Sequence, residues 1–114
     1  MFHPLFDLTG RVALVTGAGQ NMGRASAVAL AEIGADLLIA DINEKGLQET
    51  AAIIRDLGRR AVPLVCDVWD EEQIRAMYGQ GEREFGGVDV AVSIPGGNEL
   101  GHPEEISVEQ FTEV

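Results

Sequence analysis

Several residue types that define common protein classes are scarce in this chain of 114 residues. Its one cysteine, Cys66, excludes an internal disulfide. Glu32 and Asp36 interrupt the longest apolar stretches, which excludes a membrane-spanning helix there. The first ten residues contain no basic segment followed by a long apolar core, so we expect no signal peptide and a reducing, cytoplasmic setting.

Basic residues are scarce in the second half of the chain. Residues 66–114 contain twelve acidic and two basic residues, which is a net charge of −10 out of −11 for the whole chain. Nucleic acids and anionic membranes bind basic surfaces, so we expect neither as a partner. The acidic half is interpreted as a solvated surface. Cys66 lies in the apolar run "AVPLVCDV", which predicts a buried, unreactive thiol.

The remaining composition, 46% apolar and 24% charged, is that of one folded domain. Short apolar runs predict strands at 11–17, 35–41, 61–68 and 88–94. Residues spaced as on helices lie between them, at 22–34, 43–58 and 70–85. This alternation predicts a parallel sheet with helices on both faces. After a loop that starts at Pro95, residues 107–114 resemble the start of another helix.

Apolar spacing also predicts which helical side chains face the sheet. The expected inner residues are Met22, Ala25, Ala29 and Ile33 in the first helix, Leu47, Ala51 and Ile54 in the second, and Ile74, Met77, Tyr78 and Phe85 in the third. Asn43 is expected to cap the second helix, and Asp70 with Gln73 resembles a capping box. Pro63 lacks an N–H group, which predicts that its strand lies at an edge of the sheet.

A glycine-rich turn joins the first predicted strand to the first helix. Gly17, Gly19 and Gly23 form the pattern G-x-G-x-x-x-G. Free N–H groups at the start of a helix bind phosphate, and glycines allow the anion to approach the backbone. Asp41 ends the second strand 18 residues after Gly23, where a carboxylate accepts hydrogen bonds from an adenosine ribose. Its charge would repel a 2′-phosphate, so we expect NAD in preference to NADP.

The segment "TGAGQNMG" (16–23) resembles the T-G-x-x-x-G-x-G motif of the short-chain dehydrogenase/reductase family. Asn21 replaces the middle glycine, a mild change because Asn enters the left-handed region readily. "CDV" (66–68) matches the end of the family's third strand, and "GGVDVAVSIPGG" (86–97) occupies the place of G-x-x-D-x-L-V-N-N-A-G. In the latter, Ser93, Ile94 and Pro95 replace Asn, Asn and Ala.

This resemblance implies a Rossmann-like, doubly wound α/β sheet, incomplete in this chain, and an NAD(P)-dependent oxidoreductase that interconverts alcohols and ketones. It places the pyrophosphate at the glycine turn, the ribose at Asp41, and the adenine at Asp67 and Val68. The full set of expected cofactor-binding residues is Gly17, Gly19, Gln20, Asn21, Met22, Gly23, Asp41, Ile42, Asp67, Val68, Ser93 and Gly96.

Catalytic residues of the family cannot be assigned in this chain. The family's chemistry uses a Tyr-x-x-x-Lys pair and a serine, whereas Tyr78 and Lys45 are the only tyrosine and lysine and lie 33 residues apart. Nothing has the spacing of metal ligands. We therefore expect residues 1–114 to be an inactive, N-terminal cofactor-binding part of a longer protein. By resemblance, that protein would be a dimer or tetramer of identical chains.

Two alternative functions follow from the same residues. One is a non-catalytic nucleotide-binding or interaction module, which the departures at Ser93–Pro95 favour slightly. The other is an S-adenosylmethionine-dependent methyltransferase, since that class also has a glycine turn after its first strand and an acid after its second. The form of the glycine motif argues against the methyltransferase. In residues 1–114 the fourth predicted strand would be an unpaired apolar edge, whereas it would be central in a complete sheet of this type, which favours a longer parent protein.

Overall fold

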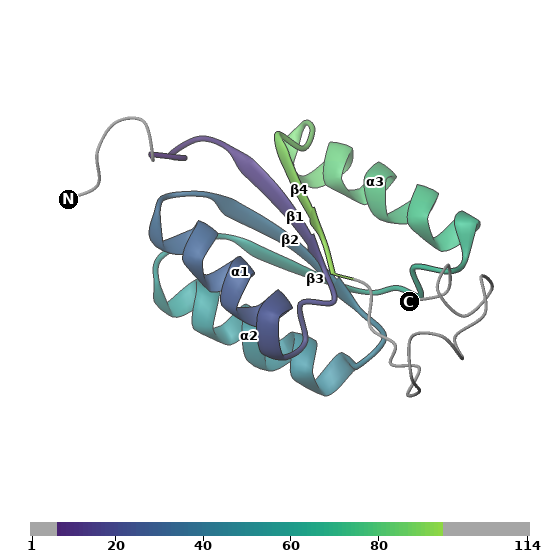
Figure 1. Cartoon of the computed structure of the whole chain (residues 1–114). Coiled ribbons are helices and arrows are strands. Elements are labelled where there is room, and N and C mark those ends of the chain that lie inside the picture. The colour runs from purple at the N-terminus through teal and green to yellow at the C-terminus, as the bar shows by residue number, and fades with distance from the viewer. Residues whose placement is uncertain (1–6, 95–114) are drawn as a thin grey trace, which may run out of the picture.

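The computed structural model describes residues 7–94. Strands and helices alternate in the order β1 (Val12–Thr16), α1 (Asn21–Glu32), β2 (Asp36–Asp41), α2 (Glu44–Asp56), β3 (Ala61–Val65), α3 (Glu71–Phe85) and β4 (Val90–Ser93). The four strands form one parallel sheet in the order β3-β2-β1-β4. The predicted α/β class is confirmed, and Figure 1 shows the arrangement.

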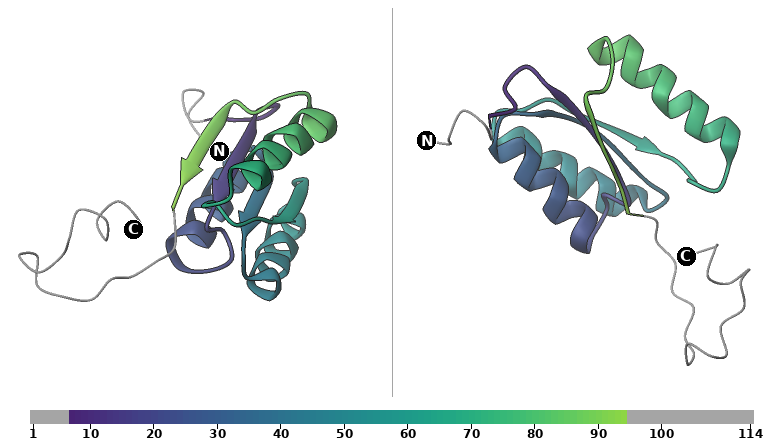
Figure 2. Two further views of the ribbon diagram at one scale, coloured as in Figure 1. Left: turned by 90° about the vertical axis from the view of Figure 1, so that its right-hand side faces the viewer. Right: turned by 45° about the horizontal axis from the view of Figure 1, so that its top comes forward.

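Helices cover both faces of the sheet. Helices α1 and α2 lie against one face and α3 lies against the other, as Figures 1 and 2 show. Right-handed crossovers explain this: the chain steps from β1 outward to β3 and then returns past β1 to β4, which reverses the face. None of the helices within residues 7–94 has the length and apolar character needed to cross a membrane.

The core has two layers because successive side chains of a strand point to opposite faces. Val15 and Ile39 are paired in register and pack with the apolar side chains of α1 and α2. Leu14 and Leu38 are paired and face the other layer, with Met77 of α3. Cys66 belongs to this second layer and is buried as predicted, and burial raises the pKa of its thiol above the usual value.

The first helix has the predicted spacing but a different inner face. Met22, Ala25 and Ala29 are exposed, with Met22 71% exposed, and Ile33 is only partly buried. The buried residues of α1 are Gly23, Ala27 and Ala31. A Cβ atom at Gly23 would overlap the carbonyl oxygen of Gly17, so the helix meets the sheet through its smallest residues. Alanines occur on both faces of α1, so the spacing of Met22, Ala25, Ala29 and Ile33 selected the wrong face.

The third helix also differs from its prediction. Tyr78 was expected in the core but is 46% exposed, whereas Met77, predicted on the same face, is buried as expected. All four strands are shorter than predicted, and the largest differences are that β3 ends at Val65 and that β4 spans only Val90–Ser93. The expected loop from Pro95 and the expected helix at 107–114 lie outside the described residues.

The predicted edge position and helix caps are confirmed. Within residues 7–94, β3 pairs with β2 alone. The missing N–H group of Pro63 therefore leaves no second neighbouring strand without a hydrogen-bond partner. Asn43 accepts the Gly46 N–H group and caps α2, with Leu47, Ala51 and Ile54 buried on its inner face. Asp70 accepts the N–H groups of Glu72 and Gln73. The amide oxygen of Gln73 accepts the Asp67 N–H group, 2.8 Å away, rather than that of Asp70.

Candidate functional site

The glycine turn lies at the carboxyl edge of the sheet, between β1 and α1. Gly17 has φ +69°, and a Cβ there would overlap the carbonyl oxygen of Ile94. Among residues 7–94, Asn21 is the sole non-glycine residue with positive φ, at 51°. This confirms that Asn21 adopts the left-handed conformation expected of it. Position 17 therefore requires glycine, because an added Cβ atom would clash, and Asn21 tolerates the positive φ that the turn needs.

The N-terminus of α1 has no side-chain cap. Its N-cap residue, Gln20, makes no side-chain hydrogen bond to the helix, and the first turn contains no acidic residue. In contrast, Asn43 caps α2 and Asp70 caps α3. The first N–H groups of a helix lack partners within the helix, and the helix dipole makes this end positive. The start of α1 is thus suited to an anion supplied from outside the chain.

Asp41 is directed at the glycine turn. Its Oδ2 atom accepts the Gly19 N–H group at 2.7 Å, and its Oδ1 atom accepts the Asn43 N–H group at 3.0 Å. Its main-chain carbonyl accepts the Cys66 N–H group at 3.0 Å, which ties it to β3. Each oxygen of an ionised carboxylate has two acceptor positions. The partly buried Asp41 carboxylate therefore keeps acceptor capacity for hydroxyl groups of a ligand.

Exposed apolar side chains gather at the same edge. Among residues 7–94, four of the seven exposed large apolar residues lie at or beyond the carboxyl ends of β1, β2 and β3. Ile42 directly follows β2, Val65 ends β3, Trp69 lies four residues after β3, and Met22 is the second residue of α1. Large apolar groups grouped at a surface are typical of a binding site. Asp67 and Val68 lie next to this group and are partly buried, and Asp67 Oδ1 accepts the Trp69 N–H group.

Ser93 lies at the end of β4, beside the end of β1. Its hydroxyl is 3.3 Å from the Thr16 hydroxyl, which also accepts the Ile94 N–H group at 3.2 Å. Strand order therefore places the expected residues along one edge: Asp67 and Val68 after β3, Asp41 and Ile42 at β2, the glycine turn after β1, and Ser93 at β4. The crossover changes face between β1 and β4, which is where ligands bind in open α/β sheets. Gly96 lies outside the described residues.

Two residues beside the turn were missed in the sequence. The Arg24 guanidinium donates to the Gly19 carbonyl at 2.7 Å and the Gly46 carbonyl at 3.0 Å. Thr50 is fully buried, and its hydroxyl lies 2.7 Å from the Ala18 carbonyl. The signal for Thr50 was a polar residue within the apolar stripe of α2. Arg24 directly follows the last glycine of the motif, but its spacing alone does not distinguish it from a surface arginine.

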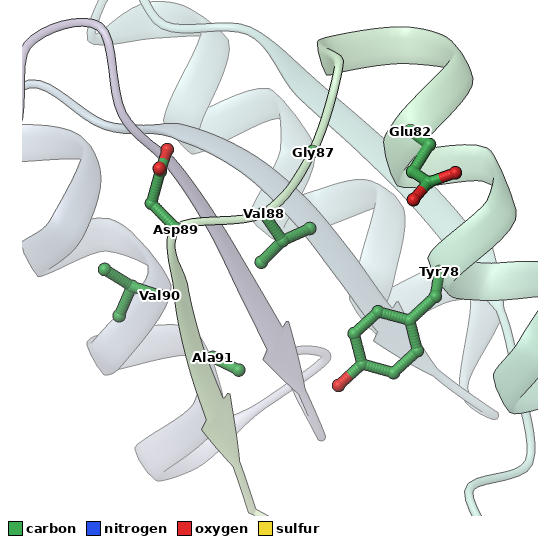
Figure 3. Close-up of a pocket in the computed structure, with 7 residues that line it drawn as sticks. All are labelled: Tyr78, Glu82, Gly87, Val88, Asp89, Val90 and Ala91. Atoms are coloured by element: carbon green, nitrogen blue, oxygen red, sulfur yellow. The ribbon is translucent and has the colours of Figure 1, made fainter.

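A second hollow lies between α3 and β4, on the other side of the sheet from α1 and α2. It is lined by Tyr78, Glu82 and residues 87–91. Figure 3 shows the Tyr78 ring and the Ala91 methyl group on facing sides of this hollow, while Val90 points to the opposite side of β4. Lys45 is in α2, on the other face of the sheet (Figure 1). The fold therefore keeps the only tyrosine and the only lysine apart.

The parallel sheet, glycine turn and acid after β2 define a nucleotide-binding α/β protein. Residues 11–114 match the family model of the short chain dehydrogenases. The chain belongs to the short-chain dehydrogenase/reductase family, and the methyltransferase alternative is set aside.

Individual proteins agree with this assignment. A short chain dehydrogenase of Passalora fulva is 35% identical over 108 residues, which are 94% of this chain and 40% of that protein. A short-chain type dehydrogenase/reductase from Mycobacterium marinum superposes with a TM-score of 0.84 at 38% identity, covering 95% of this chain and 44% of the other. Carveol dehydrogenase from Mycobacterium avium, solved in complex with NAD, gives 0.82 at 30% identity, covering 93% and 43%. The chain thus spans about two-fifths of the length of these relatives.

Proposed function

We propose that this chain is the dinucleotide-binding part of an NAD(P)-dependent oxidoreductase of the short-chain dehydrogenase/reductase type. In this proposal, residues 1–114 are the N-terminal part of one Rossmann-like domain in a longer protein. The resemblance extends the proposal to a small alcohol or ketone substrate, a cytoplasmic location and a dimer or tetramer. The observation that carries the proposal is the hydrogen bond from the Gly19 N–H group to Asp41, which joins the two expected halves of the site.

The expected binding residues fit the parts of a dinucleotide in order along the sheet edge. The uncapped start of α1 suits the pyrophosphate, with Gln20, Asn21, Met22 and Gly23 supplying the backbone. Asp41 retains acceptor positions for the ribose hydroxyls. The exposed Ile42 side chain, together with Val68, offers apolar surface for the adenine. Asp67 would accept a hydrogen bond from the adenine amino group, and Ser93 and Gly96 would lie toward the nicotinamide end.

The Asp41 carboxylate favours NAD over NADP in this proposal. A 2′-phosphate on the adenosine ribose would lie beside an ionised carboxylate, and like charges at short range repel. The nearest basic residue after Asp41 in the sequence is Lys45, whose side chain is exposed on α2. We therefore expect NADH to bind more tightly than NADPH.

Calorimetric titration of the full chain with NADH and NADPH tests the function and the preference together. Loss of the Asp41 carboxylate in Asp41→Ala should weaken NADH binding by roughly 1.5–3 kcal/mol, the usual contribution of hydrogen bonds to a charged group. It should weaken NADPH binding by less, because the same substitution removes the repulsion.

Asp36→Ala is the matched control for this experiment. Asp36 begins the strand that Asp41 ends, and its carboxylate also accepts a backbone N–H group, that of Arg60 at 2.9 Å. Asp36 lies at the amino-terminal end of β2, away from the glycine turn, so loss of its carboxylate should leave NADH affinity unchanged. A folded wild-type chain that binds neither dinucleotide would refute the proposed function. Equal NADH affinity of Asp41→Ala and wild type would refute the role of Asp41.

A further inference from the structure

Arg24 and Thr50 connect α1 and α2 behind the glycine turn. Besides its bonds to the Gly19 and Gly46 carbonyls, Arg24 donates its Nε–H group to the Thr50 hydroxyl at 2.9 Å. Its Nη2 atom also lies 3.1 Å from the Glu49 carboxylate, which balances its charge. With its oxygen accepting from Arg24, Thr50 can direct its own proton to the Ala18 carbonyl. Together the two side chains hold the carbonyls of Ala18 and Gly19.

The direction of these carbonyls determines the direction of the next N–H groups. A trans peptide group is planar, and its C=O and N–H bonds point in opposite directions. Thr50 holds the Ala18 carbonyl toward α2, and the N–H group of the same peptide, on Gly19, points to Asp41. Arg24 holds the Gly19 carbonyl toward α2, so the Gln20 N–H group points away from α2, toward the open side of the turn.

Close packing supports this arrangement of the turn. A Cβ atom at Gly46 would overlap the carbonyl oxygen of Gly19, and one at Gly19 would lie 2.7 Å from Asp41 Oδ2. The first turn of α2 therefore lies directly against the glycine turn. Without the Arg24 and Thr50 donors, the carbonyls of Ala18 and Gly19 would lose their partners in this interface, and unpaired buried carbonyls are costly. The turn would then rotate to find other donors.

We propose that Arg24 and Thr50 are positioning residues of the dinucleotide site. Through the carbonyls of Ala18 and Gly19, they orient the Gly19 N–H group toward Asp41 and the Gln20 N–H group toward the pyrophosphate. This inference rests on the proposed function for its ligand, but the orientation of the turn is a property of the chain without ligand. The two ideas can therefore be tested by separate measurements.

The main experiment compares Arg24→Met with Arg55→Met in the full chain. Like Arg24, Arg55 donates a hydrogen bond to a backbone carbonyl, that of Ala61 at 2.9 Å. Arg55 is in α2 and lies at the end of that helix far from the glycine turn. At a temperature where each protein is fully folded, Arg24→Met should bind NADH about tenfold more weakly, the equivalent of one lost charged hydrogen bond. Arg55→Met should bind as wild type does. Melting temperatures are recorded for both.

A second pair of variants addresses the hydroxyl and does not depend on Arg24→Met folding. Thr50→Ser keeps the oxygen, whereas Thr50→Val removes it with little change in shape. NADH affinity should be retained in Thr50→Ser and reduced in Thr50→Val. Arg24→Lys keeps the charge but offers no planar fork of donors, so its affinity should lie between those of wild type and Arg24→Met.

Amide hydrogen exchange provides the readout that needs no ligand. The Gly19 amide should exchange faster in Arg24→Met and Thr50→Val than in wild type, and should be unchanged in Arg55→Met and Thr50→Ser. A lower melting temperature with unchanged Gly19 exchange and unchanged NADH affinity would mean that the two residues only stabilise the fold, which overturns the inference. If the wild-type chain does not bind NADH, the proposed function fails and the exchange comparison alone decides the inference.

Discussion

Asp41 has a structural contact and a proposed ligand contact on the same carboxylate. The bonds from the Gly19 and Asn43 N–H groups fix its position before any ligand arrives. A group held in place in this way loses little freedom on binding, which favours affinity. The cost is that substitution of Asp41 also removes a contact that orders the turn. For this reason the NADH-to-NADPH ratio is a better measure of its role than NADH affinity alone.

Two glycines of α3 should respond differently to substitution by alanine. Glycine within a helix costs roughly 0.5–1 kcal/mol relative to alanine. At Gly79 an added Cβ would meet only the Arg83 Nη1 atom at 3.4 Å, so Gly79→Ala should stabilise the chain by about that amount. At Gly81 it would lie 3.0 Å from Leu38 Cδ2 and 3.2 Å from Val88 Cγ2. Crowding against the fully buried Leu38 should cancel the gain.

Urea denaturation of the two variants measures this difference. The midpoint should rise for Gly79→Ala and stay the same or fall for Gly81→Ala, with similar slopes for both. Equal stabilisation by the two substitutions would show that α3 does not pack against the sheet as closely as described. The comparison thus tests the position of an entire helix through two single residues.

At the scale of elements, the three helices differ in how they begin. Caps on α2 and α3 come from their own residues, while α1 has none within the described chain. Helix caps contribute about 1 kcal/mol, so an uncapped start lowers stability. The proposed pyrophosphate site would account for this missing cap, because an anion bound there would take the free N–H groups of α1. Stability and binding should therefore change in opposite directions when α1 is given a cap.

Gln20→Asp tests this relation. An aspartate at the N-cap should stabilise the helix by about 0.5–2 kcal/mol, through the cap and the helix dipole. It should also weaken NADH binding, because its carboxylate occupies the N–H groups and repels the pyrophosphate. Gln20→Ala adds no cap and no charge and serves as the control. Thermal melts and calorimetry give the two quantities, and a rise in both stability and affinity would contradict an anion site at α1.

Element order and type could be read from the sequence because apolar periodicity and glycine turns report local structure directly. The inner face of α1 could not, since it is set by Gly23 meeting the Gly17 carbonyl, and a glycine adds nothing to an apolar pattern. Tyr78 was misplaced for a related reason: a ring that lines a half-open hollow has the same spacing as a core residue. In the candidate site, Asp41 was predicted from its position at the end of the second strand, 18 residues after Gly23. Arg24 and Thr50 contact main-chain carbonyls, which have no side-chain pattern of their own. Thr50 could have been noticed as a polar residue within the apolar stripe of α2, whereas Arg24 has the spacing of a surface arginine.

At the scale of the whole molecule, the parallel sheet separates two surfaces. Its carboxyl edge brings together residues from β1, β2, β3 and β4, although up to 78 positions separate contacting residues such as Thr16 and Ile94. The hollow between α3 and β4 with Tyr78 lies on the opposite face from Lys45. Proton transfer by a phenol whose pKa is lowered by an adjacent ammonium group needs the two in proximity. Within residues 7–94, Tyr78 in α3 and Lys45 in α2 are held on opposite faces of the sheet.

The chain alone should therefore bind NAD(H) without catalysing hydride transfer. The test is to incubate it with NAD and a panel of small primary and secondary alcohols and to follow NADH absorbance against a control without protein. No rate above the control is expected, while calorimetry on the same sample detects NADH binding. Turnover that disappears in Tyr78→Phe would show that the sheet does not keep Tyr78 from acting on a substrate. Binding without turnover would locate cofactor recognition in this part of the fold and the chemistry outside it.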